Sequence, residues 1–416
     1  MKNKLIYLSL IMLAGIFMLG INGCKKDDPT AFTLKSLEVG TIDLNGAVSA
    51  TGVPTNPTIV AIFYTNVDVA TATSANITLI RDYDNAVVPF DITVSLSTIN
   101  IVPTELLASG ALYKLSIGAG LKSTDGQTLT ALSRTFTTKG TFAPSGAVAY
   151  WNFEDNAKDQ IGTYDASASQ YISYSASRNA AAGKAATFNG TSSIIEIPNG
   201  DVLMNSTDFT LSFWFKALDS GKGHFIIGLA AFYGFQFELG ADFKFFKMPV
   251  QFDYGDGTSG TGGDLSYNGD GKTKDNGGWK GTTFNKENTA LDGVLKEKWA
   301  HVTYVYNSTT NERMMYLNGE LVVKQDHKLW TNDAGEPTKE TGIVGLKYAG
   351  VAPETVNELA FGFIQSRAGT LWDTEAWGGY DLPGANHFKG QLDDVRIYHK
   401  ALTSAEIDLM YKSEKP

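Results

Sequence analysis

The residues that decide the fold of this chain form two adjoining stretches near its end: Phe388-Lys389-Gly390-Gln391-Leu392-Asp393-Asp394-Val395-Arg396-Ile397-Tyr398 and Lys400-Ala401-Leu402-Thr403-Ser404-Ala405-Glu406. In the first stretch, Val395 and Ile397 alternate with polar neighbours such as Arg396, which predicts a strand. In the second, Thr403 and Glu406 have the spacing of a capping box, which predicts the start of a helix. The chain is therefore expected to close with a strand, a turn and a short helix.

Two adjacent acids in this strand are predicted to lie on opposite faces, because neighbouring side chains of a strand alternate. Asp394 shares its predicted face with Arg396, and we expect the two to form an ion pair. Asp393 shares its predicted face with Val395 and Ile397. A carboxylate buried beside apolar neighbours needs backbone donors, a cation or a metal.

Strand, turn and closing helix together resemble the C-terminal signature of laminin-G-like jelly rolls, which belong to the concanavalin A-like lectin/glucanase superfamily. Earlier segments match that pattern in order, at residues 148–155, 186–198, 208–217, 299–306 and 314–323. Asn318-Gly319 predicts a two-residue hairpin turn, because both central positions of such a turn require positive φ. The resemblance covers residues 147–416 and implies a jelly-roll β-sandwich.

The preceding segment, residues 32–140, contains short alternating strands separated by turn residues. The stretches Pro54–Pro57, Tyr113–Ile117 and Thr135–Thr138 resemble bacterial Ig-like domains. The resemblance implies a sandwich that serves as a spacer, joined to the jelly roll by a Gly/Pro/Ser linker at residues 141–146. The predicted fold class is therefore all-β, with an Ig-like sandwich followed by a jelly roll that ends in a short helix.

The N-terminus has the pattern of a secretory signal, with Lys2 and Lys4 before an apolar stretch from Leu5 to Ile21. Ile21-Asn22-Gly23-Cys24 resembles a bacterial lipobox. The resemblance implies that residues 1–23 are a signal peptide, that Cys24 is lipidated, and that residues 24–31 are a tether. The alternative is an uncleaved anchor helix in which the single cysteine is incidental.

Charged residues follow this cysteine directly: Lys25, Lys26, Asp27 and Asp28. They resemble the export signal of surface lipoproteins in Bacteroidetes. The resemblance implies a lipid-anchored protein of the outer membrane that faces the outside of the cell. The alternative interpretation is a solvated tether that carries no address.

The composition of the chain limits its possible partners. Its formal net charge is −10, and the first 23 residues contribute only Lys2 and Lys4 to that value. Nucleic-acid binding is not expected, because it requires a basic face. The membrane is expected to be contacted through the N-terminal lipid only.

An enzyme of the glucanase type is not expected, although such enzymes share the jelly-roll fold. The family signature is Glu-x-Asp followed closely by a second Glu, which supplies the two carboxylates of a retaining mechanism. The only Glu-x-Asp here is Glu406-Ile407-Asp408, in the predicted closing helix and without the further acid. The five histidines lack metal-ligand spacing such as His-x-x-x-His.

Calcium is the one cofactor that the resemblance implies, because related jelly rolls hold a structural calcium near the junction of the first and last strands. Glu154 and Asp393 are the matching positions. Backbone carbonyls would have to complete the coordination shell, since calcium takes several oxygen ligands. The alternative is that Asp393 accepts backbone N–H bonds and binds no metal.

Aromatic residues in predicted loops are the candidate ligand-binding groups: Trp279, Trp330, Trp372, Trp377 and Tyr380. Aromatic faces stack on the apolar faces of sugar rings, and exposed tryptophans need an explanation. We expect at least one of these rings to contact a carbohydrate, with Trp372 and Trp377 the leading candidates. The alternative is that the rings cap the sheets beneath the loops.

The sequence as a whole favours a surface lipoprotein whose jelly roll binds a polysaccharide or glycoprotein glycan, with other glycan-uptake proteins as possible partners. A protein-binding adhesin is the first alternative, because laminin-G-like domains also bind proteins. A glycoside hydrolase with an acid pair from separate loops is the second alternative.

Overall fold

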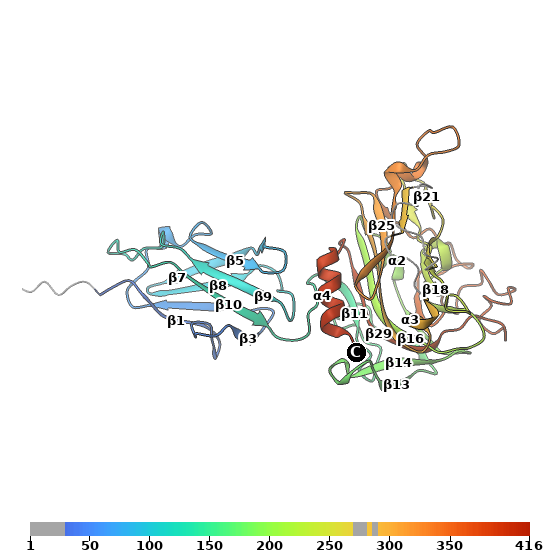
Figure 1. Ribbon diagram of the computed structural model, residues 1–416, viewed down its shortest axis with the longest axis horizontal. Helices are drawn as coiled ribbons and strands as arrows, with labels where there is room; N and C mark the ends of the chain where they lie inside the picture. The colour runs from blue at the N-terminus through green and yellow to red at the C-terminus, as the bar shows by residue number, and fades with distance from the viewer. Residues whose placement is uncertain (1–29, 269–280, 285–289) are drawn as a thin grey trace, which may run out of the picture.

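The computed structural model describes residues 30–268, 281–284 and 290–416. Two β-sandwich domains follow each other along the chain, and the closing helix lies between them (Figure 1). The all-β prediction is confirmed. The predicted signal peptide, Cys24, the charged segment Lys25–Asp28 and Trp279 lie outside the described residues. Within the described part of the chain, no helix is long and apolar enough to span a membrane.

The first domain packs two five-stranded sheets, with strand orders β2-β1-β4-β8-β7 and β3-β10-β9-β5-β6. Its strands alternate buried and exposed residues; in β4 (Ile59–Phe63), for example, Ile59, Ala61 and Phe63 are buried. The remaining strands are β1 (Leu34–Val39), β2 (Ile42–Asp43), β3 (Ala50–Val53), β5 (Ile77–Arg81), β6 (Ala86–Val87), β7 (Phe90–Ser95), β8 (Thr98–Pro103), β9 (Leu112–Ile117) and β10 (Leu132–Thr138). A 3₁₀ helix, η1, covers Val69–Thr71.

The second domain is built on a nine-stranded sheet that faces the first domain. Its strand order is β13-β14-β29-β16-β24-β25-β26-β23, and β11 pairs with β29. The strands are β11 (Ala147–Trp151), β13 (Ser173–Ala176), β14 (Lys184–Asn189), β16 (Phe209–Ala217), β23 (Thr282–Phe284), β24 (Trp299–Asn307), β25 (Glu312–Leu317), β26 (Glu320–Asp326) and β29 (Lys389–Tyr398).

A seven-stranded sheet packs on the other side, in the order β12-β15-β28-β17-β18-β19-β22. Its strands are β12 (Ala168–Gln170), β15 (Ile194–Ile197), β17 (His224–Leu229), β18 (Phe235–Leu239), β19 (Phe246–Met248), β22 (Leu265–Tyr267) and β28 (Leu359–Phe361). A small third sheet contains β20 (Phe252–Asp253), β21 (Ser259–Gly260) and β27 (Gly345–Leu346). The helices are α2 (Gly200–Met204), α3 (Asp292–Leu295), α4 (Ser404–Glu414) and the 3₁₀ helices η2 (Ala180–Ala182), η3 (Ala231–Tyr233), η6 (His327–Leu329) and η7 (Lys339–Gly342).

The core of the second domain lies between its two large sheets. Phe213 of β16 meets Phe237 of β18 edge to face, with 5.0 Å between ring centroids. Alternate residues of β16 point into this core, as its apolar alternation predicts, and leave Trp214 on the outer face. The consecutive strands β14 and β15 do not pair with each other, because they belong to opposite sheets.

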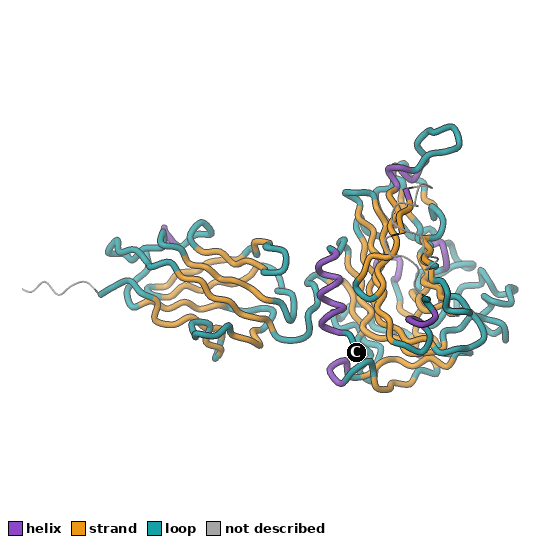
Figure 2. The backbone as a smooth tube through the Cα atoms, in the orientation of Figure 1, coloured by secondary structure: helices purple, strands orange, loops and turns teal. Residues whose placement is uncertain are grey.

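The closing helix α4 joins the two domains (Figure 2). Its predicted capping box is confirmed, since Thr403 accepts from the Glu406 backbone N–H and Glu406 accepts from that of Thr403. Ile407 and Met410 belong to a cluster of buried apolar residues that continues into the first domain. The helix therefore packs on the nine-stranded sheet and on the first domain together.

A bulge in β29 overturns one prediction about the two adjacent acids. The register between β16 and β29 shifts between Ser212 and Trp214, and Asp394 has φ of 46°. The extra residue turns Asp393 and Asp394 to the same outer face as Arg396. The predicted placement of Asp393 beside Val395 and Ile397 is wrong, whereas the predicted Asp394–Arg396 ion pair is confirmed at 3.1 Å.

Candidate functional site

The outer face of the seven-stranded sheet carries polar side chains at its β18–β19 end. Phe235, Phe237 and Leu239 of β18 point into the core, so Gln236 and Glu238 point outward. Lys247 of β19 lies opposite Glu238 in the strand register. The strand pairing therefore places an amide, a carboxylate and an ammonium group side by side.

Lys247 connects two carboxylates at this end of the sheet. Its Nζ lies 3.5 Å from Glu238 Oε2 and 3.1 Å from Asp264 Oδ2. Burial raises the pKa of Glu238 above its usual range, although Lys247 opposes the shift. Burial alone would lower the pKa of Lys247, but Glu238 and Asp264 hold it above its usual range. Gln236 donates to Glu238 at 3.0 Å.

A fully buried arginine fixes the loop that carries Asp264. Arg313 of β25 donates to the carbonyl oxygens of Gly263 and Gly262, at 3.0 and 3.2 Å. Its Nε donates to Gln325 at 2.7 Å. These bonds satisfy a guanidinium that would otherwise be costly to bury, and they hold the chain just before Asp264 in place.

A closed loop between Gly362 and Phe388 covers the rest of this outer face. Its ends meet where the Phe388 N–H donates to the Gly362 carbonyl at 3.0 Å. Phe363 and Ile364 are buried and pack with Phe225 of β17 in a small separate cluster. Long loops that lack helices and strands are uncommon in compact domains unless they are functional or disordered. This loop is ordered by its own contacts.

The loop places two of the predicted tryptophans against each other. The rings of Trp372 and Trp377 have centroids 4.9 Å apart and an interplanar angle of 48°. The ring of Trp377 also packs against that of Phe225, with 6.0 Å between ring centroids. The ring of Trp372 packs against that of Phe232, with 6.2 Å between centroids. The side chains of Trp377 and Phe232 are 38% and 36% exposed, so aromatic surface is accessible to a ligand.

Between this aromatic wall and the polar end of the sheet lies a groove of about 440 Å³. Trp372, Trp377 and Phe232 line one part of it, and Gln236, Glu238, Lys247 and Asp264 line the other. Its size falls within the ~300–1,000 Å³ that is usual for ligand pockets. Figure 1 shows β18 and the loops beyond it on the side of the second domain that faces away from the first.

Two other predicted aromatic residues do not line the groove. Tyr380 packs behind the loop against Phe363 and His387, and its hydroxyl donates to the Ser192 carbonyl at 2.5 Å. Trp330 is 1% exposed and packs edge to face on His327, with centroids 4.8 Å apart. The prediction of an accessible ring at Trp330 is therefore wrong.

Trp330 is buried because it lies directly after the short helix η6 and over the edge of the sheet core, although a polar segment precedes it. The Arg313 guanidinium lies 5.7 Å from its ring centroid, so the indole covers the buried charge. Sequence periodicity could not distinguish this ring from one in an open loop.

Sequence reasoning missed several groove residues: Phe232, Gln236, Glu238, Lys247 and Asp264. A signal for two of them exists, because Phe235-Gln236-Phe237-Glu238-Leu239 alternates as a strand with two polar residues on one face. No local pattern indicates that Asp264 meets Lys247, since their contact depends on the sheet topology.

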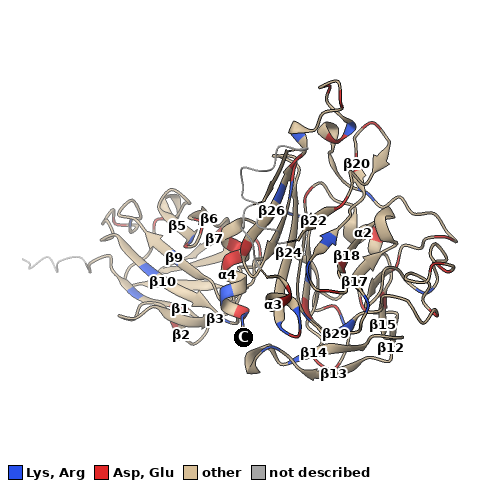
Figure 3. Cartoon of the chain, turned by 45° about the vertical axis from the view of Figure 1, so that its right-hand side comes forward, with Lys and Arg blue, Asp and Glu red and all other residues tan. Residues whose placement is uncertain are grey.

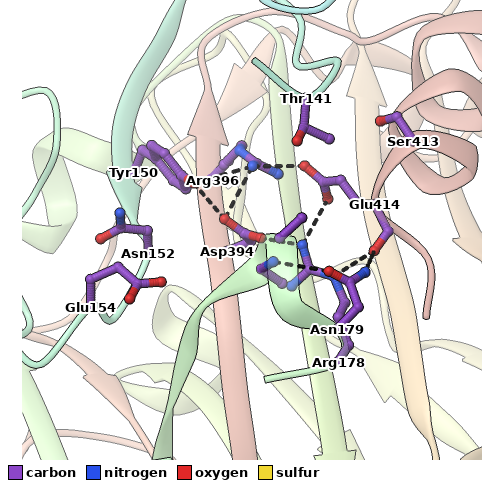
Figure 4. Close-up of a pocket in the computed structure, with 12 residues that line it drawn as sticks. Thr141, Tyr150, Asn152, Glu154, Arg178, Asn179, Asp394, Arg396, Ser413 and Glu414 are labelled. Atoms are coloured by element: carbon purple, nitrogen blue, oxygen red, sulfur yellow. Dashed lines mark hydrogen bonds and ion pairs between the residues drawn. The ribbon is translucent and has the colours of Figure 1, made fainter. Parts of the chain in front are cut away.

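Glu154, one of the two predicted calcium ligands, lies in a different part of the second domain, near the C-terminal end of α4 (Figure 4). There a polar cavity of about 140 Å³ is lined by residues that include Glu154, Asp394 and Glu414. Asp393 accepts from Arg178 at 2.7 Å, from the Asp394 backbone N–H at 2.8 Å and from the Ser177 hydroxyl. Its counter-cation is thus a guanidinium.

Glu154 does not complete a metal site with Asp393. It is exposed and accepts from the Lys184 backbone N–H at 3.0 Å. Within residues 30–268, 281–284 and 290–416, no three His, Cys, Asp or Glu side chains group so that they could hold a metal ion. The expectation that these two acids bind calcium does not fit the geometry, because protein donors already occupy the oxygens of Asp393.

The network around these acids is an ion-pair cluster that holds α4. Arg178 contacts Asp393 and Asp394, and Arg396 lies 2.8 Å from Glu414 and 3.1 Å from Asp394. Burial raises the pKa of Asp393 and that of Glu414. Burial alone would also raise the pKa of Asp394, but the two guanidiniums hold it below its usual range.

Residues 41–138 match the family described as a bacterial Ig-like domain. The first domain is Ig-like. A comparison with curated proteins found no match.

Solved structures similar to this chain include three toxin binding domains. The botulinum neurotoxin type G receptor binding domain is 12% identical, with a TM-score of 0.38 over 64% of this chain and 51% of that one. The binding domain of Paraclostridial mosquitocidal protein 1 is 16% identical, with a TM-score of 0.41 over 64% of this chain and 52% of that one. The binding domain of botulinum neurotoxin DC in complex with SialylT is 15% identical, with a TM-score of 0.38 over 65% and 51%. The match spans about half the length of these solved chains, and the similarity is distant.

Proposed function

We propose that this protein binds a carbohydrate chain in the groove between the β18–β19 end of the sheet and the closed loop. One observation carries the proposal: Trp372 and Trp377 form an accessible aromatic wall beside outward-facing amide and carboxylate groups. Aromatic rings offer an apolar surface for the C–H face of a sugar ring, and the polar groups offer hydrogen-bond partners for its hydroxyls.

Binding to immobilised polysaccharides tests this proposal. Migration of the full chain is measured in native gels that contain a panel of neutral and anionic polysaccharides. We expect at least one polymer to retard the protein, and Trp377→Ala to abolish the retardation. Tyr171→Ala is the matched control, because Tyr171 is 73% exposed and does not line the groove.

Three results would overturn the proposal that the groove binds a carbohydrate chain without cleaving it. The first is the absence of retardation by any polymer, and the second is retardation that Trp377→Ala leaves unchanged while circular dichroism shows an intact fold. The third is release of reducing ends from the bound polymer that is lost in Glu238→Gln, which would assign hydrolysis to the groove.

We further propose that the protein is lipidated at Cys24, anchored to the outer membrane and exposed to the outside, with the Ig-like domain as spacer. There it would pass a captured glycan to other glycan-uptake proteins. The signal pattern and the charged residues from Lys25 to Asp28 support this placement. β18 and the loops beyond it, which carry the groove residues, lie on the far side of the second domain from the Ig-like domain, and this suits capture away from a membrane (Figure 1).

Labelling with a palmitate analogue tests the anchor. We expect incorporation into the wild-type protein and none into Cys24→Ser, which should be released from the membrane fraction. Protease added to intact cells should digest the wild-type protein. Alanine at residues 25–28 should protect the protein from that protease while leaving lipidation unchanged. Unlabelled wild-type protein, or digestion that is the same in both proteins, would contradict the proposed placement.

A further inference from the structure

The charge arrangement of the groove points to the class of glycan that it selects. We propose, resting on the carbohydrate-binding function above, that the groove takes uncharged, polyhydroxylated chains and excludes those that bear uronate or sulfate groups. Glu238 and Asp264 act as the hydroxyl acceptors that determine this specificity.

The charge of the groove determines which ligands it admits. Among the described residues, two carboxylates and a single ammonium line it, and the ammonium of Lys247 lies between the carboxylates at 3.5 and 3.1 Å. The described lining of the groove therefore carries a net negative charge, and its ammonium group is already paired. A carboxylate or sulfate on the ligand would meet like charge in a partly desolvated site, which disfavours binding strongly.

The acids of the groove are hydrogen-bond acceptors. An ionised carboxylate only accepts hydrogen bonds, so Glu238 and Asp264 require donors from the ligand. Sugar hydroxyls donate, whereas ionised uronate and sulfate groups cannot. A hydroxyl bound to a carboxylate forms a charge-assisted bond, which is stronger than one between neutral groups. Gln236 already donates to Glu238 and so fixes the orientation of that acceptor.

Strand pairing and loop contacts position these two acceptors. Glu238 is held in the strand register between β18 and β19, and Asp264 follows the two glycines whose carbonyls accept from Arg313. Both acceptors pair with Lys247, which favours the side-chain orientations that face the groove. Such pre-organisation reduces the entropy that ligand binding has to overcome.

Polymers that share a backbone and differ in charge test the inference. Retardation in native gels is compared for hydroxyethyl cellulose and carboxymethyl cellulose, and for dextran and dextran sulfate. If the panel described above identifies a different backbone, its neutral and sulfated forms replace these pairs. We expect the neutral member to bind and the charged member to bind at least tenfold more weakly.

Two variants separate selectivity from binding. Glu238→Gln is expected to weaken neutral-chain binding about 10-fold to 100-fold, as expected for loss of a charge-assisted hydrogen bond. The double variant Glu238→Gln/Asp264→Asn removes both negative charges and leaves Lys247, so it should gain affinity for the anionic polymer. Circular dichroism and thermal unfolding establish that both variants fold.

The outcomes distinguish this inference from the proposed function. Anionic chains that bind as tightly as neutral ones, in a manner that depends on Trp377, would overturn the selectivity and leave carbohydrate binding intact. A double variant with unchanged preference would also overturn it. Failure of every polymer to bind would overturn the proposed function itself.

Discussion

Trp214 of β16 donates its indole N–H to Glu414 of α4, with 2.8 Å between Nε1 and Oε2. The same indole stacks on Tyr411, with centroids 5.8 Å apart, and lies 4.7 Å from the Arg178 guanidinium. These contacts join β16, in the middle of the second domain, to the last turn of α4. The outer face of the nine-stranded sheet is thus built to receive this helix, which also contacts the first domain.

Replacing Arg178 with methionine is expected to destabilise the second domain by about 3–5 kcal/mol, because breaking a buried ion pair leaves its carboxylates uncompensated. Asp393 would then lose its ion pair with Arg178, whereas Asp394 would keep its ion pair with Arg396. Denaturant unfolding followed by tryptophan fluorescence measures the change.

The matched control for Arg178→Met is Lys412→Met in the same helix. Lys412 pairs with Asp408 at 2.6 Å on the exposed face, where such a pair contributes about 0.3–0.5 kcal/mol. Equal losses of stability in the two variants would show that the buried cluster has no special role in holding α4.

Phe142→Ala is expected to loosen the junction between the domains. Phe142 is 6% exposed, and its ring packs edge to face on that of Tyr83 in the first domain, with 5.2 Å between ring centroids. Its backbone carbonyl accepts a hydrogen bond from the Ser413 hydroxyl of α4. Removing the ring should cost about 3–5 kcal/mol and speed proteolytic cleavage in the linker. Val102→Ala, at a site that is 40% exposed, is the control. A linker that is cut no faster than in wild type would contradict the prediction.

Quenching of tryptophan fluorescence by acrylamide is expected to distinguish two of the predicted rings. Trp377 is 38% exposed and Trp330 is 1% exposed. Trp377→Phe should therefore lower the quenchable fraction of the emission, whereas Trp330→Phe should not. The other tryptophans contribute equally to both variants. The reverse result would mean that the closed loop covers Trp377 in solution.

Acidification is expected to destabilise the protein partly through His224. Burial lowers the pKa of this residue to about 4, so the folded state keeps its imidazole neutral. The unfolded chain takes up a proton near pH 6.5 and binds more protons than the folded state below that pH. The stabilising contribution is present above pH 6.5 and is lost as the pH falls toward 4.

The pH effect is measured as the free energy of unfolding at pH 7 and pH 5 for the wild-type protein and for His224→Phe. The variant should lose less stability across this interval, by up to about 1.4 kcal/mol per pH unit. Asp393, whose pKa burial raises, acts in the opposite direction but equally in both proteins, so it cancels in the comparison. Parallel pH profiles would contradict the assignment.

Local patterns predicted most of the fold, because they depend on residues close in the sequence. The Thr403–Glu406 capping box and the Asn318-Gly319 turn, with φ of 52° and 80°, are examples. The bulge at Asp394 was not predictable, because the alternation rule assumes that each residue of a strand lies opposite one residue of the neighbouring strand. The resulting pairing of Asp393 with Arg178 depends on a contact between residues 215 positions apart.

The candidate site was predicted only in part for a similar reason. Polar loop composition pointed to Trp372 and Trp377, which do line the groove, and also to Trp330, which does not. The distribution of charged residues did not single out the groove either, because basic and acidic residues are interspersed over both domains and along α4 (Figure 3). The meeting of Glu238, Lys247 and Asp264 depends on strand order and on the loop that Arg313 holds.

The shared packing of α4 has a consequence at the scale of many molecules. One buried apolar cluster runs through the first domain, α4 and Tyr398, so the two domains share a packed junction. Copies anchored at their N-terminal ends, as proposed above, would present their grooves on the side away from the membrane. A long polymer could then span several copies at once, so its avidity would exceed the affinity of any single groove for a short oligosaccharide.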